Sequence, residues 1–521
     1  MATDWQTFPL EFKGGLISNL SPLQQGTNAI GSATILENFE PSLAGGYEKI
    51  MGFQKFNTSV VPTSGNVQCI SLVSNNYTAV VVRNDKYHVV TSSAITQAHA
   101  DNATNYAARS ALSGAKVRFT HYNFGAGEKT IFVDGVNAPA YYDGSQSAGS
   151  SVTFANASAS AIVPVVGSSH VVEFKNHLVF GKGNKVIVGE ITSDSNFTGS
   201  DALEINVKSS ITGLIVFREQ LIVFTKNSIQ KMTGVGVTDF KLAPITENLG
   251  CIKPDTIQEV GGDILFYAPD GIRSLAATEK IGDFGLEVAS KPIKKDIDGL
   301  SGTSFDSYVI REKGQYRLLA FSAFTVNESE GLIATKFVDQ GGAGLNWSKT
   351  KGIKSYVSDS RYYGEAGSVA EMILFAHTDG YIYQGEATSA FDTANIKAIF
   401  ESPFMPINDP TIRKTFYKCG LYLDPSGAIS LSLNIKYDQG EASIIQPPPV
   451  SVVTTGTGLT FFNSIASTYD SDKYSADFNK LYNNAVVGSG KTVAIRIEEE
   501  SVNPSFRLDT AVLEYSAETR Q

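Results

Sequence analysis

Cysteine, methionine and tryptophan are scarce in this chain, and charged residues are few. The three cysteines, Cys69, Cys251 and Cys419, are far apart, odd in number and without C-x-x-C spacing, which argues against a disulfide framework and a zinc site. The two tryptophans, Trp5 and Trp347, offer little aromatic platform for sugars, which weakens a lectin or depolymerase function. Charged residues make up 18% and hydrophobic residues 42% of the 521 positions, as in a folded chain rather than a disordered one.

An excess of positive charge is also missing. The formal net charge is −10 and the isoelectric point is about 5.3. A protein that grips nucleic acid through its phosphates needs a concentrated lysine and arginine surface, so the composition argues against such a grip. An acidic surface is still compatible with lining a passage through which DNA slides without sticking.

Targeting signals are missing as well. The opening stretch MATDWQTFPLEFKGG has neither the basic start nor the apolar run of a secretion signal, and no later window approaches a membrane span of roughly 20 apolar residues. We therefore expect a protein that is made and folded in a cytoplasm. Its Asn-x-Ser/Thr triplets are then expected to stay unglycosylated. They begin at Asn19, Asn57, Asn76, Asn102, Asn156, Asn196, Asn327 and Asn346.

Glycine and aromatic residues, by contrast, are plentiful. The chain has 47 Gly, 22 Tyr and 30 Phe but only 5 Met, a bias that favours strands and turns over helices. At this length the prior is two to four folding units. The composition therefore predicts an all-β protein with more than one core.

A similar unit of apolar strand, short turn and second apolar strand recurs along the middle of the chain. Neighbouring units lie 42 to 55 residues apart, and such a period, built from short strands and Gly/Asp/Asn turns, is typical of a β-propeller. The Asp-Gly pairs at Asp134-Gly135, Asp270-Gly271 and Asp379-Gly380 suit tight hairpins. The seven units are centred on Val81, Phe132, Phe180, Phe224, Phe266, Phe321 and Phe375.

We therefore predict a degenerate β-propeller of about six to seven blades over residues 60–390, with an array of β-sandwiches as the alternative. Residues 391–521 are predicted to form a C-terminal β-sandwich-like domain, in which FYKCGLYL and ISLSLNIKYD make a hairpin across a turn at 424–427. Residues 1–59 are predicted to be an extended docking arm with one short strand, SATILENFEPS. Deleting that arm should abolish assembly and leave the monomer folded.

The most tempting chemical motif is Gly488-Ser489-Gly490-Lys491-Thr492, which resembles the end of a P-loop. The full pattern needs a glycine where the chain has Ala485, and it must open a helix. Here the alternating stretch VAIRIEEE follows instead. We interpret the motif as a hairpin turn with a solvated lysine.

Other candidate sites also have plainer interpretations. The acidic stretch with Asp470, Asp472 and Asp477 lacks the ligand order of an EF-hand, and the run Glu498–Glu500 is expected to be an exposed strand end, with proximity to a DNA path as the alternative. The histidines show no ligand spacing, and no G-x-S-x-G elbow appears. We assign no catalytic, cofactor or metal residue, and channel-lining residues stay unassigned. The histidines are His88, His99, His121, His170, His177 and His377.

Several short motifs resemble the tail nozzle or hub proteins of short-tailed bacteriophages, also called tail tubular or DNA-stabilisation proteins. They are the Gly14-Gly15-Leu16 entry, the Leu36–Ser42 stretch LENFEPS, the Gly45-Gly46-Tyr47 exit, the Pro269–Leu275 stretch PDGIRSL and Lys280–Gly285. Together these features cover about a fifth of the chain.

The resemblance implies a non-enzymatic virion tail protein. It implies a homohexameric ring below the head-to-tail adaptor, which continues the DNA channel, retains the genome until ejection, anchors tail fibres or spikes, and uses no cofactor or sequence-specific DNA contact. Closed rings arise when the rotation per subunit divides a full turn. The alternatives are a propeller-type polysaccharide-degrading enzyme and a carbohydrate-binding module.

Overall fold

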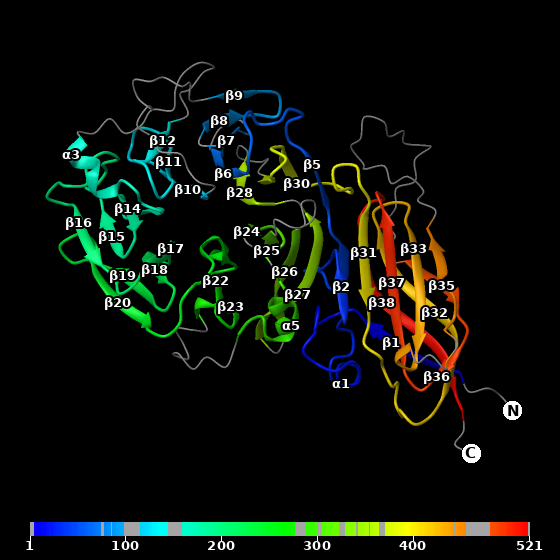
Figure 1. Cartoon of the computed structure of the whole chain (residues 1–521). Helices are drawn as coiled ribbons and strands as arrows, with labels where there is room; N and C mark the ends of the chain where they lie inside the picture. Colours follow the sequence, from blue (N-terminus) through cyan, green and yellow to red (C-terminus); the bar gives the residue numbers. More distant parts are fainter. Residues whose placement is uncertain are drawn as a thin grey trace.

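The computed structural model of the chain is an all-β protein with a ring of small sheets at one end and a β-sandwich at the other (Figure 1). It describes residues 5–73, 78–84, 86–97, 115–143, 159–276, 288–300, 302, 304–321, 329–339, 342–353, 355–363, 370–440, 444, 446–454 and 480–518. The ring and the sandwich confirm the predicted fold class.

Six separate antiparallel sheets of three or four strands make up most of the ring. In chain order each takes one of the predicted units, and the last also contains β5 (Gly52–Lys55). The strands are β6 (Val67–Val73), β7 (Thr78–Arg83), β8 (Lys86–Val90), β9 (Ile95–Gln97), β10 (Arg118–Tyr122), β11 (Lys129–Val133), β12 (Ala140–Tyr142), β13 (His170–Phe174), β14 (His177–Lys182), β15 (Lys185–Val188), β16 (Leu203–Asn206), β17 (Ile211–Phe217), β18 (Gln220–Thr225), β19 (Ile229–Thr233), β20 (Lys241–Thr246), β21 (Gln258–Val260), β22 (Asp263–Ala268), β23 (Gly271–Ser274), β28 (Val357–Tyr363), β29 (Ala370–Ala376) and β30 (Ile382–Thr388).

A seventh place in the ring is taken by four strands of a larger sheet. These are β24 (Ser304–Ile310), β25 (Gln315–Phe321), β26 (Ser329–Asp339) and β27 (Gly342–Ile353). The innermost strand β24 packs between β21 and β28, and β28 in turn packs on β6. The ring therefore closes with seven innermost strands.

The last blade is completed by the N-terminal segment. β5 pairs with β30, with Phe53 opposite Gly385. Phe53 is 2% exposed and packs edge-on against Phe375 and Tyr383, with ring centroids 5.2 and 5.1 Å away. A strand from the start of the chain thus closes the propeller.

The C-terminal region is a sandwich of two sheets with one apolar core. One sheet contains β31, β37, β33 and β34, and the other contains β1 (Gln6–Glu11), β4 (Tyr47–Lys49), β38, β32 and β35. The strands are β31 (Ile396–Glu401), β32 (Lys414–Pro425), β33 (Ser430–Tyr437), β34 (Val450–Val453), β35 (Lys480–Ala485), β36 (Ser489–Gly490), β37 (Val493–Ser501) and β38 (Phe506–Ala517).

The predicted hairpin at 424–427 is wrong. β32 pairs with β38, β35 and β36, whereas β33 pairs with β34 and β37 in the opposite sheet. The alternation of apolar residues reflects one buried face of each strand, and Leu423 and Leu431 do meet in the common core. Such a pattern is the same whether the turn joins neighbours in one sheet or crosses between two sheets.

The predicted arm is built into its own chain. It contains β1 (Gln6–Glu11), α1 (Pro22–Asn28), β2 (Ile35–Glu37), β3 (Phe39–Pro41) and β4 (Tyr47–Lys49). β1 pairs with β38, and β2 lies between β27 of the propeller and β31 of the sandwich. One nine-stranded sheet therefore runs from the propeller into the sandwich.

The stretch predicted as one strand, SATILENFEPS, forms two. Asn38 breaks it with a positive φ of 53°, a conformation that asparagine tolerates better than most residues. The Asn38 amide donates to the carbonyl oxygens of Lys351 and Lys397, and its oxygen accepts from the Lys351 amide. This one buried side chain ties the arm to both larger modules.

The described residues include few helical segments, and none is long and apolar enough to cross a membrane. Those not yet given bounds are α3 (Ala159–Ile162), α5 (Lys294–Gly299), η1 (Val163–Val165), η2 (Pro254–Thr256), η3 (Lys291–Ile293) and η4 (Asp438–Gly440).

Candidate functional site

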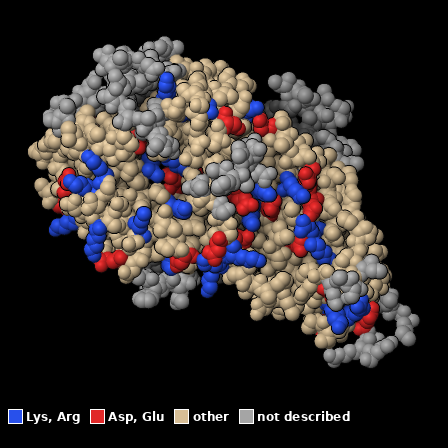
Figure 2. All heavy atoms as spheres, viewed as in Figure 1, with Lys and Arg blue, Asp and Glu red and all other residues tan. Residues whose placement is uncertain are grey.

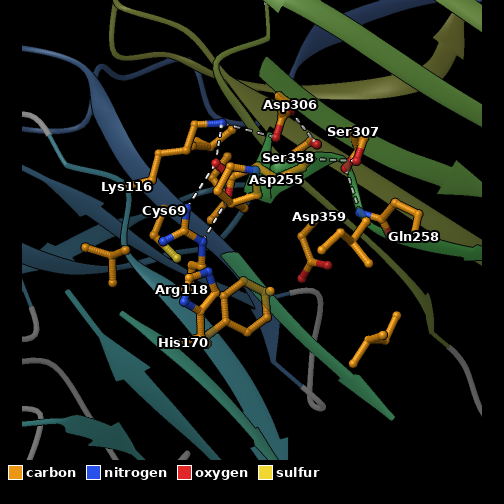
Figure 3. Close-up of a pocket in the computed structure, with 18 of the residues that line it drawn as sticks. Cys69, Lys116, Arg118, His170, Asp255, Gln258, Asp306, Ser307, Ser358 and Asp359 are labelled. Atoms are coloured by element: carbon orange, nitrogen blue, oxygen red, sulfur yellow. Dashed lines mark hydrogen bonds and ion pairs between the residues drawn. The ribbon is translucent and has the colours of Figure 1, made fainter. Parts of the chain in front are cut away.

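A polar cavity of about 260 Å³ lies on the axis of the propeller (Figure 3). Its wall takes residues from β6, β13, β17, β24 and β28, from β10 with the segment before it, and from η2 with β21. All seven blades therefore converge on one site.

A partly buried ion cluster forms one side of this cavity. Arg118 binds Asp255 through two hydrogen bonds, Nε to Oδ1 at 2.9 Å and Nη2 to Oδ2 at 3.2 Å. Lys116 Nζ lies 3.7 Å from Asp255 Oδ2 and 3.7 Å from Asp306 Oδ1. Burial raises the pKa of the Asp255 carboxyl, but the two cations outweigh it and hold that pKa below its usual value.

Asp306, on β24, is satisfied mainly by hydroxyl groups. Its Oδ2 accepts from Ser355 Oγ at 2.8 Å and from Ser358 Oγ at 2.6 Å. Burial nevertheless raises the pKa of Asp306, because desolvation outweighs the attraction of Lys116. This carboxylate joins β24 to the neighbouring blade.

Asp359, on β28, is the third carboxyl group of the cavity. Its Oδ2 accepts the Leu72 amide of β6 at 2.7 Å, so it links the last blade to the first. Burial raises the pKa of Asp359 to about 6, against the opposing effect of that hydrogen bond. Burial thus disfavours its ionised form.

Two further groups in the wall are neutral. Burial and the nearby Arg118 lower the pKa of His170 to about 3, and burial raises the pKa of the Cys69 thiol. Neither group is therefore charged near pH 7.

The charged members of this cavity belong to no motif that distinguishes them in the sequence. Lys116 and Arg118 sit in KVRF, and Asp306 and Asp359 sit within strand-like stretches. A charged residue that interrupts an apolar inner strand was the only signal in the sequence. It becomes informative only when the strands are known to share an axis.

The P-loop-like motif opens no helix, as predicted, but the predicted hairpin is wrong. Ser489-Gly490 is strand β36, which pairs with β32, whereas β37 follows directly after Thr492 and pairs with β31 and β33 in the opposite sheet. The backbone amides of Lys491 and Thr492 donate to Asp438 Oδ1 at 2.8 and 2.9 Å. The amides that would cradle a phosphate therefore already bind a carboxylate.

The glutamate run is only partly exposed, so the predicted exposed strand end is wrong at one position. Glu499 is 1% exposed and its Oε2 lies 2.6 Å from Lys49 Nζ of the arm. Strand alternation places it on the inner face with Ile495 and Ile497. That period was readable in the sequence, whereas the distant lysine was not.

The remaining candidates form no common site in the part of the chain that the structure describes. Asp470, Asp472, Asp477, His99 and Lys280–Gly285 lie outside the described residues. Among the described positions no three His, Cys, Asp or Glu side chains form a group able to hold a metal ion. The three cysteines are free and buried, and Trp347 is a core residue at 1% exposure.

We expect the buried His88 to make the fold sensitive to acid. His88 is fully buried, and burial with the nearby Lys86 and Arg83 lowers its pKa to about 4. The unfolded chain, with a histidine pKa near 6.5, then takes up the proton first, so stability is lost as pH falls from about 6.5 to about 4. We expect His88→Leu to remove about 2 kcal/mol of the fall in the free energy of unfolding between pH 7 and pH 5.

Urea titrations of both proteins at the two pH values measure this difference. If the His88→Leu variant loses as much stability as the wild type on acidification, the buried neutral histidine is not a source of the acid sensitivity.

Comparisons with known proteins give no family. No family model matches the chain, and neither does any curated protein. Among solved structures it is similar to the AfRom2 CNH domain, with 10% identity and a TM-score of 0.35, over 64% of this chain and 98% of that one. An ancestral GH74 enzyme gives 12% identity and a TM-score of 0.35, over 70% of this chain and 51% of the other.

The tail fibre of Staphylococcus aureus phage P68 is a further similar structure. It gives 10% identity and a TM-score of 0.20, over 68% of this chain and 90% of that chain. Likenesses this weak carry no argument about function.

Proposed function

We propose that the chain is a structural tail protein of a short-tailed bacteriophage, a nozzle or hub that continues the DNA channel below the head-to-tail adaptor. Six copies would form the ring, retain the genome until ejection, and hold tail fibres or spikes on the outside. The protein would be a non-enzymatic part of the virion tail. Its starting point is the resemblance of the arm motifs to that family.

The observation that carries the proposal is the place of those motifs in the fold. Gly15 lies against the backbone of Trp347, where an added Cβ would come within 2.8 Å, and Leu36 lies in β2 between the propeller and the sandwich. Gly46 packs on the Leu508 carbonyl of β38. The resembling residues thus join the propeller to the sandwich, which supports a structural rather than an enzymatic function.

The surface charge is compatible with this function. On the face shown in Figure 2, acidic and basic side chains are interspersed, without a broad area of one sign. Such a surface has no strong electrostatic hold on a phosphate backbone. DNA would pass it without sequence-specific binding.

The axial cavity of one propeller is too small to be the DNA path. At about 260 Å³ it holds a small molecule, whereas a DNA duplex is roughly 20 Å across and needs an open bore. The proposed channel therefore lies between subunits of the ring.

The experiment that tests the proposal is the mass of the purified protein in solution, alone and after mixing with tail-less phage particles, followed by negative-stain imaging. We expect closed rings, or stoichiometric attachment at the portal vertex. A persistent monomer that ignores the particles would overturn the proposal. Particles that already carry tails are the control, since their vertex is occupied.

A polysaccharide-degrading enzyme is the second candidate, favoured by the carboxyl groups of the axial cavity. A pair with opposite pKa shifts, such as Asp255 and Asp359, is the pattern of an acid and a base. However, both oxygens of Asp255 are bound by Arg118, and glycoside cleavage usually needs two working carboxyl groups. This candidate would be favoured if the protein hydrolyses a polysaccharide and the Asp359→Asn variant does not.

A further inference from the structure

The charges of the axial cavity do not balance. Its wall carries three carboxyl groups, Asp255, Asp306 and Asp359, and two basic side chains, Lys116 and Arg118 (Figure 3). Lys116 lies between Asp255 and Asp306, and Arg118 is bound to Asp255 on two nitrogens. The two basic side chains therefore pair with Asp255 and Asp306, and Asp359 has no cationic partner among them.

Asp359 has no cationic side chain at ion-pair distance among the described residues. The two arginines whose charge acts on Asp359, Arg311 and Arg361, are paired with other carboxylates. Arg361 binds Glu128 with both terminal nitrogens, at 2.7 and 2.8 Å, and Arg311 binds Glu371 at 3.0 Å. Asp359 is only partly buried, so its carboxylate is accessible from the cavity and has no cation beside it.

We propose that the axial cavity binds a small organic ammonium ion, with its charged head on Asp359. The site goes beyond the proposed tail function and does not depend on it. The cavity volume of about 260 Å³ leaves room for an ammonium group and a short chain, since a water occupies about 30 Å³ of liquid.

The other surroundings suit an ammonium head better than an anion or a metal ion. An anion would face the uncompensated Asp359, while Lys116 and Arg118 are already neutralised. A metal ion would need further ligands, and the described residues offer no group of three that could hold one. An ammonium group needs only one carboxylate and neutral acceptors for its three N–H bonds.

Neutral hydrogen-bonding groups are present in the wall. The inner strand of each blade has a neighbouring strand on one side only. The backbone N–H and C=O groups along its other edge are therefore unpaired within the blade. His170, which is neutral near pH 7, lines the cavity, as do the hydroxyl-bearing residues Ser307 and Ser358. A hydroxyl oxygen whose hydrogen is donated to one acceptor can still accept from an ammonium N–H.

Calorimetric titration of the full chain with methylammonium chloride at pH 7.5, against sodium chloride at equal ionic strength, tests the site. We expect saturable binding of one methylammonium per chain. Asp359→Asn should weaken it at least tenfold, because the amide keeps the hydrogen bond from Leu72 but loses the charge. Glu204→Gln, which removes an exposed carboxylate from an outer strand, should leave it unchanged.

Tetramethylammonium provides a test that needs no variant. It carries the same charge but has no N–H donor, so it should raise the melting temperature of the wild-type protein less than methylammonium does. Equal effects of the two ions, equal binding by Asp359→Asn, or the absence of saturable methylammonium binding would each overturn the proposal.

Discussion

A chain that lacks residues 1–59 is expected not to fold as a monomer. The segment contributes ten buried apolar side chains, and full burial of a Leu, Ile or Phe side chain stabilises a fold by about 1.5–3 kcal/mol. The deletion removes these contacts and exposes the apolar surfaces that they cover, in a fold whose net stability is typically only about 5–15 kcal/mol. They are Leu10, Phe12, Leu16, Ala33, Leu36, Phe39, Tyr47, Ile50, Phe53 and Phe56.

The structure thereby changes what the deletion would mean. On the sequence alone, truncation was expected to abolish assembly while the monomer stayed folded. Because β2 and β5 complete sheets of the larger modules, failure to assemble would now follow from failure to fold. Circular dichroism and urea unfolding of the truncated chain decide between the two outcomes. A cooperative unfolding transition at wild-type stability would contradict this expectation.

Single substitutions in the same segment test whether its buried contacts stabilise the fold, without shortening the chain. Phe12 is 2% exposed and packs edge-on against Phe400, with ring centroids 4.7 Å apart. Phe12→Ala should cost about 3–5 kcal/mol in the free energy of unfolding. Leu43, 61% exposed in the same segment, is the matched control, and Leu43→Ala should change stability by about 0.5 kcal/mol or less.

Lys49→Met is expected to destabilise the fold by about 3–5 kcal/mol, because it leaves the buried Glu499 carboxylate without its cation. The two side chains are 1% and 0% exposed, and Lys49 Nζ lies 2.6 Å from Glu499 Oε2. Lys49 also donates to the carbonyl oxygens of Ser501 and Asn503 at 3.2 and 3.3 Å. This ion pair fastens β4 of the arm to the sandwich.

A double-mutant cycle distinguishes the lost charge balance from lost packing. The double variant with Lys49→Met and Glu499→Leu removes both charges, so it should recover a large part of the stability that either single change loses. The exposed pair Lys208–Glu247, with side chains 70% and 54% exposed, is the control, and Lys208→Met should cost about 1 kcal/mol or less. Urea unfolding gives all these values. A double variant no more stable than the singles would contradict the role of charge.

The local character of the chain was predictable from its sequence. Strand type, Asp-Gly turns and the recurring unit depend on neighbours in the chain, and Gly271 and Gly380 do take positive φ at their turns, 136° and 82°. The rejected P-loop also followed from local pattern, because an alternating stretch cannot open a helix.

Partnership between distant segments was not predictable in the same way. Apolar alternation marks a buried face without naming the strand that lies beside it, which is why the hairpin at 424–427 failed. Arm and body meet across more than 300 residues, as at Asn38 with Lys351. No local pattern in the arm indicated that its neighbours would be its own chain.

The sequence by itself thus determined that the chain is all-β, repeated in the middle, and free of a local catalytic motif, because these properties are written in the nearest neighbours of each residue. Only the tertiary structure decided that seven inner strands share one axis and that Asp359 meets the cavity without a cation. It also decided that Lys49 and Glu499 form a buried pair. These facts depend on distances between side chains that lie far apart in the sequence, and such distances exist only after the chain has folded.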